Sequence, residues 1–536
     1  MRRRKKYFEL NEPLLHADHR RPVTRREMIA QGLRAGAGTF VASSMLSMLA
    51  SSRAMGALSS DIDDLRSNLC GIAGSGNLKI PFICIDLAGG ANISGSNVLV
   101  GGAGGQLDLL TTAGYSKLGL PGDMIPGAAE ATPSPTSNGL HVDTSLGLAF
   151  HSDSQFLRGI LERAPTALGN VNGAVIPARS DNDTGNNPHN PMYGIARAGA
   201  GGQFLDNIGS RSSMSGGNSM APNMMIDPSS PPTKIDRPSD VVGLVDTGDL
   251  GSLSPADAVA AMETMQRITA KKMQVVSSGL SAPEDQALKD NVSCQYVKST
   301  YLADAFGGAP PNPDDRPSSG GAGVIVNNTG GIFSEAEFDS EREFRKTASI
   351  MKMVVDGLAG AGTITMGGYD YHTGDRATGE LRDLRAGRCM GACLEYAALM
   401  GKPLMLYVFS DGSVFSNGMI DSSVNGRGKG VWTGDNSSTA ASFFLVYDPV
   451  AQQTAIRQQV GWMRSDASVE TTATPAANNV NLLVETVILN YMALHGEEGS
   501  FDQAGFFPSH GLGSSTNWAN YLAFGQIDSV TGGQIT

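Results

Sequence analysis

The chain has 536 residues, 40% of them hydrophobic, which is enough for one large core or two ordinary ones and excludes a chain that is disordered throughout. Its formal charge of −12 opposes contact with phosphate backbones and argues against a nucleic-acid-binding protein. The five cysteines are an odd number without even spacing, which excludes a disulfide-dense scaffold.

The first 57 residues are typical of a twin-arginine export signal. Arg25 and Arg26 lie between a basic start and a weakly apolar run at 35–52. That run lacks the roughly 20 strongly apolar residues of a spanning helix, so we expect a cleavable signal and no permanent membrane span. We therefore predict export of the folded chain by the twin-arginine translocase to the bacterial periplasm or exterior. Removal of residues 1–57 takes away 11 basic and 4 acidic groups and leaves 29 basic and 48 acidic ones, a formal charge of −19.

Apolar runs and helical patterns alternate along the rest of the chain. The run at 78–87 predicts a buried strand that stops at Gly89 and Gly90. Further strands are expected at 171–177, 361–366, 403–410 and 442–447. Helices are expected at 152–163, 255–276, 336–358, 377–400 and 480–494. This alternation predicts an α/β fold with a doubly wound, largely parallel sheet.

We expect residues 58–536 to form a single domain. Two stretches, 205–240 and 306–332, are rich in Ser, Pro, Gly and Asn and are predicted to be loop insertions within it. Cys389 and Cys393 are four residues apart in a helical pattern, where a disulfide is geometrically awkward, so buried free thiols are expected there.

Polar residues follow several of the predicted strands. Asp86 ends the first strand, Asp370 and His372 follow the strand at 361–366, and Asp411 follows the strand at 403–410. Asp435 lies in a glycine-rich segment that we expect to be a loop. Ligands of open α/β sheets gather beyond the carboxyl ends of the strands, and residues two apart in an extended segment point the same way. Asp370 and His372 could therefore share one cation.

These segments together resemble the exported DUF1501 family, which is related to the alkaline phosphatases and sulfatases. The family's Gly-Gly-Trp-Asp-x-His turn is matched by GGYDYH at 367–372, and its Ser-Glu-Phe-Gly turn is similar to SDGS at 410–413. LAGGANISG at 87–95 looks like its Gly-Gly-x-Asp turn, and TGDNS at 433–437 echoes its Gly-Thr-Asp-His-Gly motif. The resemblance extends from about Pro81 to about Asp448.

The resemblance implies an alkaline-phosphatase-like three-layer α/β/α sandwich with a divalent metal site for zinc, manganese or calcium. Such cations would polarise a small phosphate or sulfate ester and stabilise the displaced group. The implied ligands are Asp86, Asp370, His372, Asp411, Asp435 and His510.

Two functions remain open. The first is a metal-dependent hydrolase of phosphate or sulfate esters. The second is a non-catalytic relative with an eroded metal site that acts as a binding or assembly component of the envelope, because Asn92 and Asn436 replace a carboxylate and an imidazole of the family motifs. The acidic residues could also serve only to bind the amides of tight turns. No nucleophile is identified, since Ser94 and Ser410 fit ordinary loop serines.

Overall fold

The computed structural model describes residues 58–70, 79–180, 187–228, 230–245, 253–305 and 311–536. The signal predicted for residues 1–57 lies outside the described residues. The chain divides into two compact units. The larger unit contains the described residues of 79–244 and 311–536, and the smaller one contains 58–70, 245 and 253–305. The single domain expected for 58–536 is thus divided by a small unit that the sequence patterns did not separate.

The larger unit is built on a seven-stranded mixed sheet with the order β4-β11-β8-β1-β7-β5-β6. Strands β8, β1, β7, β5 and β6 are parallel, whereas β11 runs antiparallel to both β8 and β4. The strands are β1 (Phe82–Ala88), β4 (Val171–Pro177), β5 (Leu205–Gly209), β6 (Thr233–Lys234), β7 (Ala359–Gly367), β8 (Leu404–Ser410) and β11 (Ala441–Tyr447). The predicted α/β class with a largely parallel sheet is confirmed.

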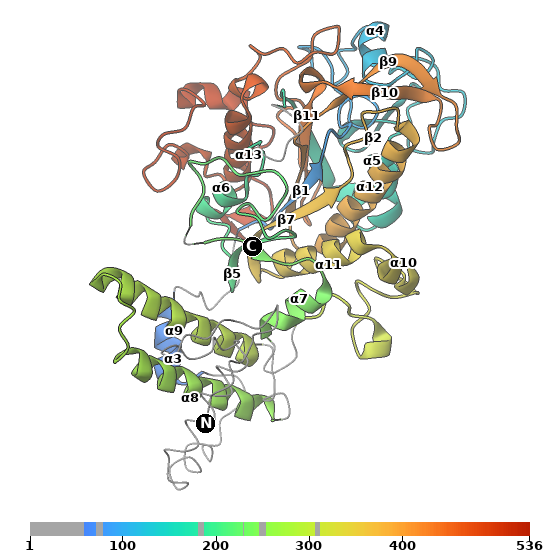
Figure 1. The fold of residues 1–536 in the computed structure, drawn as a ribbon. Coiled ribbons are helices and arrows are strands. Elements are labelled where there is room, and N and C mark those ends of the chain that lie inside the picture. Colours follow the sequence, from blue (N-terminus) through green and yellow to red (C-terminus); the bar gives the residue numbers. More distant parts are fainter. Residues whose placement is uncertain (1–57, 71–78, 181–186, 229, 246–252, 306–310) are drawn as a thin grey trace, which may run out of the picture. The chain divides into compact units, whose positions relative to one another are not determined.

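Helices cover both faces of this sheet. On one face lie α6 (Met192–Arg197) and α13 (Val480–Leu494), and on the other lie α5 (Gln155–Arg163), α11 (Arg342–Val355) and α12 (Arg376–Leu399), as Figure 1 shows. Every residue of β4, β8 and β11 is buried, which explains why these strands appear in the sequence as continuous apolar runs.

Shorter elements surround this core. They are α4 (Thr112–Lys117), β2 (Val142–Leu146), β3 (Leu148–His151), α7 (Pro238–Val242), α10 (Glu335–Ser340), the hairpin β9 (Val414–Asp421) and β10 (Lys429–Asp435), β12 (Val530–Thr531) and β13 (Gln534–Ile535).

Two of the predicted elements differ in the structure. The helix expected at 336–358 is interrupted at Glu341, whose backbone is extended and whose side chain caps the second helix. The stretch 205–240, predicted to be a loop insertion, contributes β5 and β6 to the edge of the sheet. These strands escaped prediction because β5 (LDNIG) has little apolar content and β6 has only two residues.

The smaller unit consists of α3 (Ser60–Asp64) followed by a π-helical turn at Leu65–Leu69, together with α8 (Pro255–Met273) and α9 (Ala282–Ala305). Its apolar core is small and contains Ile62 and Val297. A disulfide joins Cys70 to Cys294 across 224 residues of sequence. Such a bond stabilises a small unit by restricting its unfolded state. Cys84, Cys389 and Cys393 are buried and free, as expected for the last two.

In the part of the chain that the structure describes, no helix combines the length and the apolarity that a membrane span requires.

Candidate metal centre

The site lies where β1, β7 and β8 end. The turn after β1 passes so close to the segment after β7 that a Cβ on Gly89 would lie 2.3 Å from the backbone nitrogen of Asp370. Gly89 also has a φ of +124°, a conformation that L side chains rarely adopt. A glycine is therefore required for the two segments to approach each other.

The segment between β7 and α12 presents alternate side chains to opposite sides. Tyr369 and Tyr371 are fully buried, whereas Asp370 is exposed and His372 is half-buried. The Tyr369 hydroxyl donates a hydrogen bond of 2.8 Å to the carbonyl of Arg382 on α12. The buried tyrosines thus anchor the segment and leave Asp370 and His372 together on its outer side, as the two-residue spacing predicted.

Asp435 reaches the same place from the β9–β10 hairpin. It is the last residue of β10 and pairs with Val414, so it belongs to a strand and not to the loop that we expected. The next residue, Asn436, accepts a hydrogen bond of 2.9 Å from the backbone of Ser438 and caps a short 3₁₀ turn. The Asn436 side chain therefore stabilises the loop in which it lies.

Asp370, His372 and Asp435 form the one group of three or more metal-type ligands found among the described residues. Nδ1 of His372 lies 2.6 Å from Oδ1 of Asp370 and 2.9 Å from Oδ1 of Asp435. This nitrogen is shielded from solvent and has no hydrogen bond of acceptable geometry among the described residues. The side chains of Asp370 and Asp435 are 63% and 45% exposed, and that of His372 is 28% exposed.

These three side chains offer two carboxylate oxygens and one imidazole nitrogen. Zinc accepts such mixed oxygen and nitrogen ligands, and a site with three protein ligands retains a position for water or substrate. Manganese also binds carboxylates readily, whereas calcium takes six to eight oxygen ligands and is less well matched by an imidazole. The three side chains therefore supply a donor set of the kind that holds a divalent cation, and the exposure of Asp370 and Asp435 leaves this group open to solvent.

Asp86 also lies near the end of β1, but it is outside the group of three and is fully buried. Its carboxylate accepts hydrogen bonds from the backbone of Asn218 at 2.6 Å, from the backbone of Ser219 at 3.0 Å and from the Thr365 hydroxyl at 3.1 Å. Burial raises the pKa of Asp86, although these hydrogen bonds oppose the rise. The carboxylate that was predicted to be a ligand thus binds the backbone of residues 218 and 219 and is not part of the group of three.

The structure also keeps Asp411 and His510 out of the group of three. Oδ1 of Asp411 accepts a hydrogen bond of 2.8 Å from the backbone of Gly89, and its Oδ2 accepts one of 3.2 Å from the Asn218 amide. His510 lies in the carboxyl-terminal region, with its ring 5.3 Å from that of Trp518 and 5.2 Å from that of Phe501.

The two serines near the strand ends are held by the backbone. The Ser410 hydroxyl donates to the carbonyl of Leu87 at 2.8 Å and accepts from the backbone nitrogen of Ala91 at 3.0 Å. The Ser94 hydroxyl donates to the carbonyl of Thr439 at 2.5 Å. Both hydroxyls stabilise loops, in agreement with the structural role considered from sequence.

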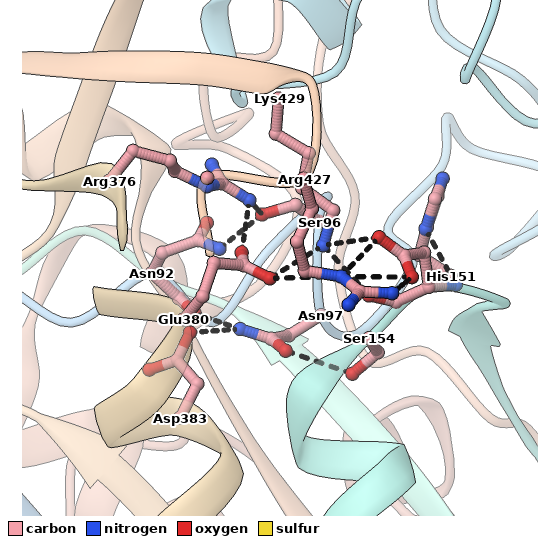
Figure 2. Close-up of polar contacts among 12 residues, drawn as sticks. Asn92, Ser96, Asn97, His151, Ser154, Arg376, Glu380, Asp383, Arg427 and Lys429 are labelled. Carbon is pink, nitrogen blue, oxygen red and sulfur yellow. Dashed lines mark hydrogen bonds and ion pairs between the residues drawn. The ribbon is translucent and has the colours of Figure 1, made fainter. Parts of the chain in front are cut away.

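A buried ionic network connects the segments that carry the three ligands (Figure 2). Arg376, at the start of α12, is fully buried and pairs with Glu380 at 2.6 Å. Lys429, at the start of β10, is also fully buried and lies 3.0 Å from the second oxygen of Glu380. Arg376 further packs over the ring of Trp432 on β10 at 4.5 Å. Glu380 and Arg376 thus tie the helix that follows His372 to the strand that ends in Asp435.

The network continues to the buried face of the His372 segment. Asp383 on α12 accepts hydrogen bonds from Asn97 at 2.7 Å and from the Tyr371 hydroxyl at 3.2 Å. Tyr371 in turn accepts a hydrogen bond of 2.8 Å from the backbone of Asn92. Burial, together with the charge of Glu380, raises the pKa of Asp383 to about 8. The residue between the two ligands Asp370 and His372 is therefore fixed by hydrogen bonds on its inner side.

Sequence reasoning missed this network. Arg376 lies one residue before the helix predicted at 377–400 and four residues before Glu380; such a spacing indicates an ion pair when both residues are helical but is equally common on exposed helix surfaces. The alternation of Tyr369 and Tyr371 with polar residues was the available signal for a segment with one buried side.

Comparisons of this chain with protein-family models, with curated proteins and with solved structures found no match.

Proposed function

We propose that this protein is an exported divalent-cation-binding protein that holds one ion between Asp370, His372 and Asp435. The observation that supports this most directly is the shielded nitrogen of His372, which lies between two carboxylate oxygens without a hydrogen bond of acceptable geometry. A cation would give all three atoms a shared partner.

We further infer that the chain is a divergent member of the DUF1501 family with an alkaline-phosphatase-like sandwich. The motif segments after β1, β7 and β8 lie at one edge of a largely parallel sheet, which supports this inference. The function proposed does not depend on it, because the ligands themselves carry the chemistry.

Hydrolysis of phosphate or sulfate esters is the second candidate function. It is favoured by the small number of protein ligands and by the exposure of Asp370 and Asp435, which leave room for water and an ester on the ion. A one-metal reaction with water as nucleophile is the form that these residues suit, because Asp86, Asp411 and Ser410 are engaged with the protein. Without turnover, the same site would serve a binding or assembly component of the envelope.

Export to the periplasm or exterior is part of the proposal. The Cys70–Cys294 disulfide supports it, since such bonds persist mainly in oxidising compartments. Replacement of both Arg25 and Arg26 by Lys should retain the precursor in the cytoplasm, as measured by pulse-chase and fractionation. Efficient export of this variant would contradict the route.

Metal content tests the proposed site. We expect near-stoichiometric zinc or manganese, measured by mass spectrometry, in protein purified without chelators, and only traces in Asp370→Ala. Asp502→Ala is a matched control, because Asp502 is also exposed but lies outside the group of three. Metal absent from the well-folded native protein, or retained in Asp370→Ala, would refute the site. Activity on aryl phosphates and sulfates, lost with the metal, would then decide for hydrolysis.

A further inference from the structure

We propose that a polar cleft beside β5, β6 and β7 is a second binding site, which takes a small polyhydroxylated molecule that carries a phosphate or sulfate group. The cleft has a volume of about 680 Å³, within the range of small-molecule sites. Its walls come from the loop after β5, the β6 strand, the first turns of α11 and the end of β7.

The lining of the cleft selects a polar ligand. Among the described residues that form it, none has an aromatic or a purely aliphatic side chain, and six are charged. An apolar ligand would find no surface to bury, and a sugar would find no ring to stack on. Hydrogen bonds and charge must therefore supply the affinity, as they would for a hydroxylated anion.

Two of the four cations in the cleft are neutralised within the protein. Arg342 pairs with Asp236 at 2.6 Å, and Lys346 pairs with Glu343 at 2.6 Å. Lys346 also donates a hydrogen bond of 2.6 Å to the carbonyl of Thr365. These pairs account for both acidic side chains of the lining and fix the first turns of α11 against the sheet.

Arg211 and Lys234 are the other two cations. Both are exposed, and among the described residues no carboxylate lies within ion-pair distance of either. The cleft therefore has an excess of two positive charges in a chain whose formal charge is −12. Isolated positive charge in a concave site of an acidic protein favours an anion, and an Arg side chain can bind phosphate or sulfate oxygens with two parallel hydrogen bonds.

The wall that carries Arg211 is held in place by buried contacts. Asp86 accepts the backbone hydrogen bonds of Asn218 and Ser219 at the end of the loop. The Ser210 hydroxyl accepts one of 2.8 Å from the backbone of Thr365 at its start. Both ends of the loop are thus fixed to the central strands, so the cleft is built before a ligand arrives and less entropy is lost on binding.

The cleft is separate from the metal centre. It lies on the β5 side of the end of β7, whereas Asp370 approaches Gly89 on the β1 side. Binding at the cleft should therefore not require a metal. Loss of ligand binding at the cleft and loss of metal at the centre can be measured independently.

Isothermal titration calorimetry on the metal-stripped chain tests the proposal. The probes are glucose 6-phosphate, glucose 6-sulfate, glucose and inorganic phosphate. We expect at least one of the two esters to bind at least about tenfold more tightly than either glucose or phosphate, since charge and hydroxyl contacts both contribute. Affinity should fall with rising salt. Replacement of both Arg211 and Lys234 by Gln should weaken ester binding by about tenfold or more.

Lys271→Gln with Lys272→Gln is the matched control. It makes the same change in net charge at two exposed positions on α8, and it should leave ester binding unchanged. The Arg211 and Lys234 variant should keep its circular dichroism spectrum and its metal content, whereas Asp370→Ala should keep ester binding. Absence of ester binding, equal binding of glucose, or unchanged affinity in the Arg211 and Lys234 variant would each overturn the proposal.

Discussion

Two sets of carboxylates lie near the carboxyl ends of the central strands, and they have different surroundings. Asp86 lies in β1, two residues before its end, and Asp411 directly follows β8; both are fully buried and accept hydrogen bonds from neighbouring backbone and amide groups. Asp370 lies three residues after β7 and Asp435 ends β10 of the neighbouring hairpin; both side chains are exposed and meet at the nitrogen of His372.

The difference shows how burial decides the use of an acidic side chain. A buried carboxylate is tolerated only with several hydrogen bonds, and those bonds occupy the oxygens that a cation would need. An exposed carboxylate has no such requirement and can accept a cation with little rearrangement. Position at a strand end is therefore insufficient to identify a ligand, because the number of donors around each oxygen also matters.

Removal of the imidazole should give the largest effect. His372→Ala takes away the nitrogen between the two carboxylates, so bound metal should fall from near-stoichiometric to trace levels while thermal stability changes little. His510→Ala is the matched control, because that imidazole packs against Trp518 and Phe501 away from the centre. Metal content is measured by mass spectrometry. Equal loss of metal in both variants would contradict the assignment of the ion to the group of Asp370, His372 and Asp435.

The buried network should matter for both stability and metal binding. Arg376→Ala would leave Glu380 without its arginine and remove the packing on Trp432, and we expect a loss of about 3–5 kcal/mol in the free energy of unfolding. Metal affinity should also fall, by about tenfold or more, because the network orients both ligand segments. Urea unfolding and metal competition measure the two effects.

Arg388→Ala on the same helix is the control for this variant. Arg388 forms a partly exposed pair with Glu162 at 2.7 Å, and its loss should change stability by less than about 1 kcal/mol. Similar losses of stability in the two variants would show that the buried position of Arg376 does not increase its contribution to the free energy of unfolding.

Replacement of Asp86 should lower stability and leave the metal content unchanged, which is the opposite of the result expected for replacement of His372. Asp86→Ala would leave the donors of Asn218, Ser219 and Thr365 unsatisfied in the interior, at a cost of about 2–4 kcal/mol, with metal content unchanged. Asp86→Asn keeps an acceptor and should cost less. Loss of metal in a folded Asp86→Asn protein would place Asp86 among the ligands after all.

The last test concerns the pH dependence of stability. The pKa of Asp383 is raised from 3.8 to about 8, so between these values the folded chain keeps a proton that the unfolded chain releases. Its contribution therefore lowers stability as pH rises from about 4 to 8, by up to about 1.4 kcal/mol per pH unit.

Asp383→Asn removes this titration. The decline of unfolding free energy between pH 5 and 8, followed by urea midpoints, should be less steep in the variant than in the native protein. Asp502→Asn, at an exposed position, should leave the slope unchanged. Identical slopes in all three proteins would show that the Asp383 proton is not retained on folding.

Much of the fold was accessible from sequence because its main strands are apolar runs. The strands at 171–177 and 403–410 were placed within one residue of β4 and β8. In the smaller unit the helix expected at 255–276 is found as α8, but α9 and the unit itself were not predicted, because α9 has no clear apolar face and the Cys70–Cys294 pair is separated by 224 residues. Local patterns contain no information on such distant pairing.

For the candidate centre, the sequence alone determined the class of chemistry and one local geometry. The pair Asp370 and His372 could be recognised because alternation in an extended segment is a local property. Only the tertiary structure decided that Asp435 joins this pair while Asp86 and Asp411 do not. That choice depends on burial and on donors from residues more than a hundred positions away, such as Asn218 beside Asp86, and these are set when the chain folds.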